Sequence, residues 1–275
     1  VRNHNLKTVL RLLYKQPYSC FEMAKIMKIS AAAVRKNILA LLSAGVIRVA
    51  EEDESRPKSR GGQHVRYCLC ENDDIFMCLD MSNYGDKEIA TCRIYSMAGN
   101  LLATKTFPMS QLISGEEIAA IIAGIKQLIA ENGLNGKHII KINVSVPGQI
   151  NRKTGYFILS SRFENSEEVN LSRIFAQAFD SDVRVMNDTQ YAALGSAANG
   201  EFEDKSYVYY VYVGAIGIGS AIFSDGNIWE GGDGFTGEIG ILFCSFISFL
   251  VKVHAKFMNL QSNLCRIYSR FSSFM

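Results

Sequence analysis

The sequence predicts an α/β protein in which a small basic domain precedes a larger unit of strands and helices. Charge is distributed unevenly: residues 1–70 contain 13 Lys or Arg against 5 Asp or Glu, a net charge of +8, whereas residues 71–275 contain 16 against 22, a net charge of −6. Short apolar runs alternate with amphipathic helical segments after residue 70, the pattern of a sheet covered by helices. A glycine-dense loop at 231–238 ends this alternation.

Residues 1–70 have the pattern of three helices followed by a hairpin. Apolar residues recur at helical spacing in segments 6–13, 19–27 and 31–42. Ser30 is a favourable N-cap for the third helix, and Gly45 is a favourable residue just beyond its end. Segments 46–49 and 64–69 are typical of two strands around a polar tip, residues 51–62. We therefore expect a winged helix-turn-helix domain over residues 1–70.

The residues expected to contact DNA lie at the start of the third helix and on the hairpin tip. In helix-turn-helix proteins the second motif helix enters the major groove with its N-terminal residues. The expected contacts are Ser30, Ala31, Ala32, Arg35, Lys36 and Asn37 on the helix, and Arg56, Lys58 and Arg60 on the tip. A three-helix bundle with a solvated basic face is the alternative. The basic hairpin favours double-stranded operator DNA as a partner.

Residues 71–240 predict a sheet with covering helices. Strands are expected at 75–80, 90–95, 101–107, 139–146, 183–186, 207–213 and 220–223, with helices at 115–132, 171–179 and from Asp188 onward. The pair Asn187-Asp188 follows one strand, and Glu238 lies in the glycine-dense loop. Two interpretations of the pair are open: the residues cap the following helix, or they belong to a ligand site.

Cysteine usage and hydropathy indicate a cytoplasmic protein. The seven cysteines are scattered along the chain, which suits a reducing compartment. No secretory signal is visible, and the longest apolar run, 239–251, is shorter than the ~20 residues that cross a bilayer. We therefore expect no membrane partner.

A set of motifs appears in order along residues 5–240. It comprises residues 30–34 of the third helix, 144–150 with Pro147-Gly148, 154–155, 185–195 with Asn187-Asp188, 217–219, and Gly237-Glu238-Ile239-Gly240. The ordered set resembles the ROK family (repressors, open reading frames and kinases), in particular its sugar-responsive repressors of the xylose and N-acetylglucosamine type. The resemblance implies an actin-like, ribonuclease H-like fold of the sugar-kinase type, with a first lobe over 71–186 and a second lobe that starts over 187–240.

The resemblance also implies a sugar site at Asn187, Asp188 and Glu238. In family kinases the residue at the position of Asp188 removes a proton from the sugar hydroxyl, and those at Asn187 and Glu238 hydrogen-bond to hydroxyls. These roles suit the side chains, because carboxylates accept from hydroxyls and an amide both donates and accepts.

Two departures argue against kinase activity. The family's phosphate loop, Asp-x-Gly-Gly-Thr, is replaced by Asp80-Met81-Ser82-Asn83-Tyr84, which lacks the glycines that bring backbone amides to phosphate. Ala215-Ile216 stands where the second phosphate segment carries Gly-Thr. Phosphoryl transfer depends on positioning and on charge stabilisation, so we expect no enzyme activity and no bound cofactor.

The family pattern is expected to stop after Gly240. Ile241 stands at the position of a histidine that ligates zinc in the family, and the family's cysteine cluster is absent from 241–275. We therefore expect no metal, since zinc needs about four converging ligands. We interpret residues 241–275 as an atypical tail that leaves the second lobe incomplete, through truncation or a frameshift. A divergent, naturally short member is the alternative. An incomplete lobe is expected to expose apolar patches.

The sequence thus predicts a sugar-responsive DNA-binding regulator, a repressor of carbohydrate-utilisation genes that the missing region could render defective. Its expected partners are operator DNA, a small sugar or sugar phosphate and, where the missing region is not required, further copies of the chain in a homodimer or higher homo-oligomer. The first alternative is a ROK-type kinase that phosphorylates a hexose with ATP, and the second is a remnant that binds DNA without ligand control.

Overall fold

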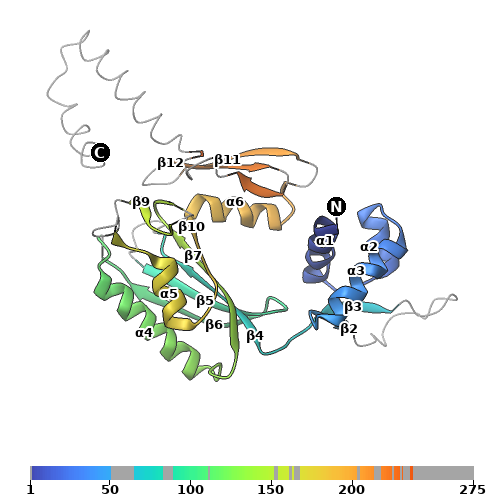
Figure 1. Cartoon of the computed structure of the whole chain (residues 1–275), viewed down its shortest axis with the longest axis horizontal. Helices are drawn as coiled ribbons and strands as arrows, with labels where there is room; N and C mark the ends of the chain where they lie inside the picture. Colours follow the sequence, from blue (N-terminus) through green and yellow to red (C-terminus); the bar gives the residue numbers. More distant parts are fainter. Residues whose placement is uncertain are drawn as a thin grey trace, which may run out of the picture.

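The computed structural model describes residues 2–50, 65–82, 89–110, 112–151, 154–160, 163, 168–202, 205–213, 218–224, 226–229, 231 and 236–237. Arg56, Lys58, Arg60, Glu238 and the whole of 241–275 therefore lie outside the described residues. Figure 1 shows a small N-terminal unit, residues 2–50 and 65–70, beside a larger α/β unit that begins at residue 74.

Three helices form the N-terminal unit: α1 (Arg2–Lys15), α2 (Cys20–Met27) and α3 (Ala31–Ser43). Ser19 and Glu22 form a capping box at the start of α2, in which each side chain accepts from the other residue's backbone N–H. Lys28 ends α2 in the left-handed conformation, with φ of 53°. Ser30 then caps α3 by accepting from the Ala33 N–H at 3.2 Å. The predicted helices, and Ser30 as a cap, are confirmed.

A three-stranded antiparallel sheet completes this unit. Its strands are β1 (Tyr18–Ser19), β2 (Ile47–Val49) and β3 (Arg66–Leu69), in the order β1-β3-β2. Ile47 pairs with Leu69 and Val49 with Tyr67, so the two strands expected to flank the hairpin tip do pair. Their buried side chains join the helices in one apolar core that contains Val9, Met23, Val34 and Ile38.

The α/β unit is built on a five-stranded sheet in the order β10-β7-β4-β5-β6. The strands are β4 (Asp74–Asp80), β5 (Ile89–Ser96), β6 (Leu101–Pro108), β7 (His138–Val146) and β10 (Val183–Asn187). β4, β5 and β6 form an antiparallel meander, whereas β7 and β10 run parallel to β4. The three parallel strands therefore end at the same edge.

Helices α4 (Gly115–Glu131) and α5 (Leu171–Phe179) cover one face of this sheet. On β4 every second residue, Ile75, Met77 and Leu79, is buried in a core that also contains α4 and α5, as expected for a strand with one covered face. The apolar stripe predicted for segment 115–132 is confirmed, because Ile118, Ile121, Ile125 and Leu128 are its buried residues.

Helix α6 (Asp188–Ala198) lies between the opposite face of the sheet and a second, smaller sheet. The smaller sheet consists of β11 (Tyr207–Val213), β12 (Ile218–Ser224) and β13 (Asn227–Trp229), all antiparallel. A further two-stranded piece is formed by β8 (Gln149–Ile150) and β9 (Phe157–Leu159). Alternate side chains of β11, namely Tyr207, Tyr209, Val211 and Val213, are exposed.

None of the helices among the described residues is long and apolar enough to cross a membrane.

Candidate functional site

Three of the sequence motifs meet at the carboxyl edge of the parallel strands. β4 ends at Asp80, β7 at Val146 and β10 at Asn187. Asp80 pairs with Ser145, and Asn187 pairs with Val146, so the strand ends lie side by side. In open α/β sheets ligands bind outside the carboxyl ends of the strands. This edge is therefore the candidate ligand site.

Asn187 joins two of the motifs through its side-chain amide. Its Oδ1 accepts from the Thr189 N–H at 2.9 Å, which makes Asn187 the N-cap of α6. Its Nδ2 donates to the Gly148 carbonyl at 3.1 Å. The capping interpretation is thus confirmed for Asn187. The same side chain also ties the loop after β7 to the start of α6, which a simple cap would not do.

Asp188 is the first residue of α6, where a carboxylate is stabilised by the helix dipole and by free N–H groups. Its Oδ1 accepts from the Thr189 N–H at 2.6 Å and from the Thr189 hydroxyl at 3.2 Å. A carboxylate held in this way can accept a hydrogen bond from a ligand hydroxyl or act as a general base.

Two glycines bring the later motifs to the first turn of α6. A Cβ atom on Gly219 of β12 would lie 2.0 Å from Oγ1 of Thr189, which is buried. The next residue, Ser220, donates its hydroxyl to the Gly237 carbonyl. A Cβ on Gly237, whose φ is +96°, would lie 2.8 Å from the Ser220 carbonyl oxygen. Thr189, Gly219 and Gly237, one residue from each of three motifs, therefore lie close together, and the site residue Glu238, itself outside the described residues, follows directly after Gly237.

Two polar residues at this edge were not singled out as site residues from the sequence. The Gln149 side chain is buried, and its Oε1 has no hydrogen-bond partner, which is costly for a buried amide. Buried Ser82 donates its N–H, at 3.0 Å, and its hydroxyl to Oδ1 of Asp80. The Asp80 carboxylate thus already accepts two hydrogen bonds from its own segment. Of the residues that replace the family's phosphate segments, Asn83, Tyr84, Ala215 and Ile216 lie outside the described part.

On α3, the expected DNA-contacting residues fall into two groups. Ser30, Ala31, Ala32, Arg35 and Lys36 are exposed. Asn37 is only 6% exposed, so the expectation that it faces outward is wrong. It lies three residues after Val34 and four before Leu41, both buried, and this spacing places it on the inward face of the helix.

Arg66 of β3 is bound within the N-terminal unit. It forms an ion pair with Glu22 of α2, with Nη2 to Oε1 at 2.8 Å and Nε to Oε2 at 3.3 Å. Burial opposes ionisation of Glu22, but hydrogen bonds from Ser19 and Arg66 outweigh burial and lower its pKa. This pair fastens the hairpin to α2.

Within the described residues there is no group of three or more His, Cys, Asp or Glu side chains placed to hold a metal ion. Cys244 and Cys265 lie outside those residues.

Comparison with known proteins places these observations in a family. The sequence pattern of the ROK family matches residues 83–248, which is 166 of 275 residues. The match extends eight residues past Gly240, where the sequence analysis placed its end. The chain belongs to the ROK family.

Relatives of two kinds are similar to this chain. A beta-glucoside kinase of Listeria monocytogenes is 31% identical over 145 residues, which are 53% of this chain and 46% of the kinase. The DNA-binding transcriptional dual regulator NagC of Escherichia coli is 24% identical over 241 residues, which are 87% of this chain and 57% of the regulator. The chain thus spans about half the length of these relatives.

The fold is also that of a ROK protein of known structure. The crystal structure of a ROK family transcriptional regulator, described as a homologue of the E. coli Mlc protein, superimposes with a TM-score of 0.61 at 19% identity. The superposition covers 86% of this chain and 59% of the chain of that regulator. The predicted resemblance to the repressors of the family is confirmed.

Proposed function

We propose that this chain is a sugar-responsive, DNA-binding transcriptional regulator. The observation that carries the proposal is the reach of the similarity to a regulator. Residues 71–275 number 205, or about three quarters of the chain, so an alignment with NagC over 87% must extend into the first 70 residues. The match to the kinase, over 53%, is short enough to fit within the α/β unit.

The N-terminal unit supports DNA binding as a winged helix-turn-helix domain. α2, the turn at 28–30 and α3 are followed by the β2–β3 hairpin, and the exposed start of α3 presents Ala31, Ala32, Arg35 and Lys36. Small side chains allow close approach to a groove, and the two cations can contact bases or phosphates. Arg56, Lys58 and Arg60 would add phosphate contacts from the hairpin tip. Asn37 is left out of the proposed interface because it is buried.

The carboxyl edge supports a small polyhydroxylated ligand, a sugar or sugar phosphate. Asn187, Asp188 and Glu238 would supply the hydrogen bonds to its hydroxyls. Motifs that lie far apart in the sequence meet at the first turn of α6, so a ligand there would contact both the five-stranded sheet and the segment after β12. A sugar that binds one arrangement of these parts more tightly than another would shift the chain toward that arrangement. The sugar would thereby control the binding of a homodimer of this chain to paired operator half-sites.

The second candidate function is a ROK-type sugar kinase that phosphorylates a hexose with ATP, which the similarity to the Listeria kinase favours. Against it, the Asp80 carboxylate is engaged by Ser82, and the sequence lacks the glycines and the hydroxyl of the family's phosphate segments. We propose that the chain is not an enzyme.

Fluorescence anisotropy with the full chain tests the proposal. The probe is a 30-base-pair duplex selected by the chain itself from random sequence. Affinity should fall steeply with salt, and one of D-glucose, D-xylose, N-acetyl-D-glucosamine and its 6-phosphate should change it. Absence of DNA binding even at low salt would refute the regulator. Release of ADP from ATP–Mg²⁺ that depends on one of these sugars would instead support the kinase.

A further inference from the structure

Each residue of the linker between the two units, Cys70 to Asp73, makes a hydrogen bond or an ion pair. The Cys70 N–H donates to the Val46 carbonyl at 2.9 Å, so Cys70 still belongs to the N-terminal unit. Asn100 Nδ2, in the turn between β5 and β6, donates to the Glu71 carboxylate. Residues 71–73 are exposed, but a linker with a contact at every residue differs from the flexible linkers that usually separate domains.

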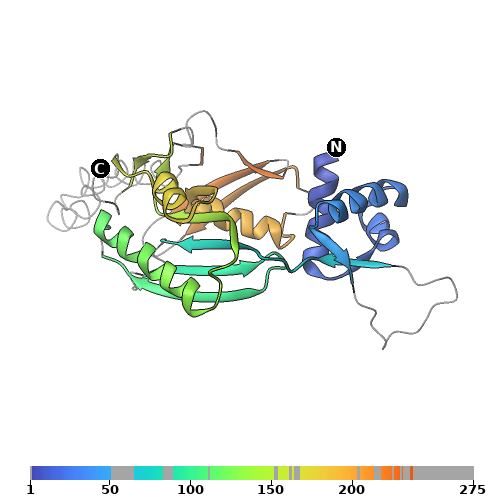
Figure 2. The same ribbon diagram turned by 60° about the horizontal axis from the view of Figure 1, so that its bottom comes forward.

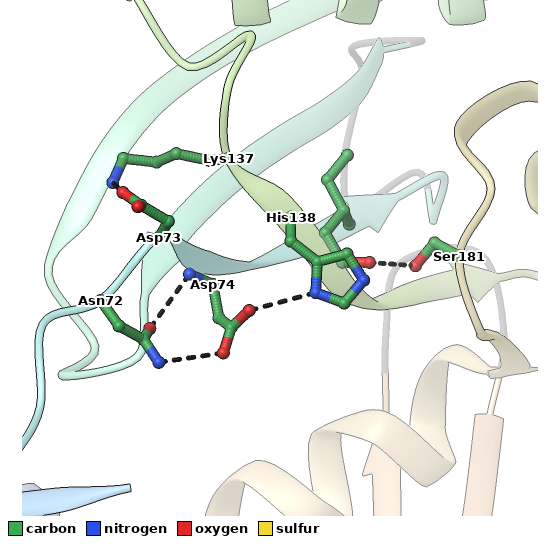
Figure 3. Close-up of polar contacts among 7 residues, drawn as sticks. Asn72, Asp73, Asp74, Lys137, His138 and Ser181 are labelled. Carbon is green, nitrogen blue, oxygen red and sulfur yellow. Dashed lines mark hydrogen bonds and ion pairs between the residues drawn. The ribbon is translucent and has the colours of Figure 1, made fainter. Parts of the chain in front are cut away.

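The second half of the linker is attached to the start of β7, as Figure 3 shows. The Asp73 carboxylate accepts from Lys137 Nζ at 3.1 Å, and the Asp73 carbonyl accepts from the His138 N–H at 2.8 Å. Asn72 accepts from the Asp74 N–H at 3.0 Å and donates to the Asp74 carboxylate at 2.9 Å. Asp74 also contacts Nδ1 of His138 at 3.1 Å.

Tyr14 of α1 adds a direct contact between the units. A Cβ atom on Gly99 would lie 2.2 Å from Cε2 of Tyr14, so the ring lies against the glycine backbone. Gly99 has a φ of +86°, which favours glycine at this turn on conformational grounds as well. Because Asn100 of the same turn binds Glu71, the β5–β6 turn holds both α1 and the linker.

No single contact of this set is strong. Asp73 is 87% exposed in its ion pair with Lys137, and exposed ion pairs contribute little to stability. The backbone hydrogen bond to His138, the packing of Tyr14 and the short length of the linker act together. The orientation of the N-terminal unit relative to the sheet is restricted because contacts are made at two separate places, the β5–β6 turn and the start of β7.

The strands that begin at the linker end at the candidate ligand site. β4 runs from Asp74 to Asp80, and β7 runs from His138 to Val146. At ~3.3 Å per residue, these strands join the two edges over about 20–30 Å. The sheet is a continuous packed element that touches both the linker and the site, and elements of this kind can carry coupling between two sites when they have two arrangements.

We propose that residues 70–74, together with Tyr14, Asn100, Lys137 and His138, form a coupling clamp that holds the N-terminal unit in one orientation on the sheet. The linker is then a rigid connection and not a flexible tether. The regulatory consequence, that a change at the carboxyl edge reorients the DNA-binding surface, rests on the proposed function.

Double electron–electron resonance on the full chain tests the clamp. Spin labels are introduced as non-canonical amino acids at Ala40 on α3 and Ala130 on α4, both exposed. We expect one narrow distance distribution, and a distribution at least about twofold broader in Tyr14→Ala/Lys137→Ala, because unclamped domains move relative to each other by default. The matched control is Tyr207→Ala/Lys205→Ala, at exposed positions beyond the clamp, which should leave the width unchanged.

Two results overturn the clamp: a broad distribution in the unmodified chain, or an unchanged width in the folded double variant. If that variant does not fold, the milder double variant Tyr14→Leu/Lys137→Gln, which still alters both contact places, is measured instead, and an unchanged width overturns the clamp equally. The readout needs neither DNA nor sugar, so a failure of the clamp is distinguishable from a failure of the proposed function. In the anisotropy assay, the folded double variant should keep DNA binding. Its sugar-dependent change in DNA affinity should be at least about fivefold smaller than that of the unmodified chain.

Discussion

Gly219 on β12 lies so close to Thr189 on α6 that a methyl group on the glycine would sit 2.0 Å from the threonine Oγ1. This contact joins the smaller sheet to the residue that follows Asp188. Because Asn187 and Asp188 both hydrogen-bond to the Thr189 N–H, the position of Thr189 determines how the two candidate ligand-binding side chains are held.

Gly219→Ala is therefore expected to destabilise the chain by about 1–3 kcal/mol, the usual cost of forcing an extra carbon into a packed site. The added methyl would also meet Cβ and Cγ2 of Thr189 at 3.1 and 3.3 Å, so a rotation of the hydroxyl alone cannot relieve it. Urea unfolding followed by circular dichroism measures the effect.

A double variant and a control separate the contact from a general effect of alanine. Gly219→Ala/Thr189→Ala should recover part of the loss, because the closest atom is removed. Gly195→Ala, within α6, has no heavy atom within 4 Å of the added Cβ and should be neutral or stabilising by up to about 1 kcal/mol through helix propensity. Equal losses for Gly219 and Gly195 would contradict the importance of the contact.

Asn187→Ala should lower the free energy of unfolding by about 2 kcal/mol, because the helix cap and the hydrogen bond to Gly148 are each worth about 1 kcal/mol. Asn187→Ser keeps an oxygen that can cap α6 but cannot reach the Gly148 carbonyl in the same way, so it should lose about half as much. Chemical denaturation of both variants decides this. If serine is as damaging as alanine, the cap contributes little, and the contact with Gly148 is the main role of Asn187.

Arg35→Ala and Lys36→Ala should each weaken DNA binding and, where the cation meets a phosphate, reduce the slope of log affinity against log salt by about 1. Lys205→Ala, an exposed lysine of the α/β unit, is the matched control and should leave the slope unchanged. Anisotropy titrations at four salt concentrations measure the slopes. Identical slopes for all three variants would remove α3 from the interface.

Local signals predicted most of the N-terminal unit. Ser30 and Gly45 mark the ends of the third helix through short-range chemistry, and the structure places α3, Ala31–Ser43, between them. Asn37 shows where such reasoning fails. A polar side chain interrupts the apolar stripe, and periodicity then permits either face, whereas the packing of α3 against its neighbours puts Asn37 inside.

The sequence shows where the motifs of the site lie along the chain, but it does not show how they come together in space. Its motifs are recognisable as Asn187-Asp188 and 237–240, yet the meeting of Thr189 with Gly219 depends on the packing of α6 against β12, for which no local signal exists. Strands β1, β8 and β13 are two or three residues long, too short for alternation to show. The buried amide of Gln149 is likewise a consequence of tertiary packing.

The ion pair between Glu22 and Arg66 should make the stability of the N-terminal unit depend on pH. Hydrogen bonds lower the pKa of Glu22 below its ordinary value of 4.5 in the folded state, so the folded protein holds this proton less tightly than the unfolded chain. The resulting stabilisation is present above about pH 4.5 and is lost as the pH falls through the folded pKa.

Both side chains are partly exposed, 28% for Arg66 and 41% for Glu22, so we expect Glu22→Gln to cost only about 1 kcal/mol near neutral pH. The difference between variant and unmodified chain should shrink at acid pH, where Glu22 is protonated and resembles glutamine. Urea unfolding at a series of pH values measures that difference, with Glu116→Gln in the exposed first turn of α4 as the control. A loss that stays constant down to the lowest pH would assign the role of Glu22 to its neutral capping contacts and not to its charge.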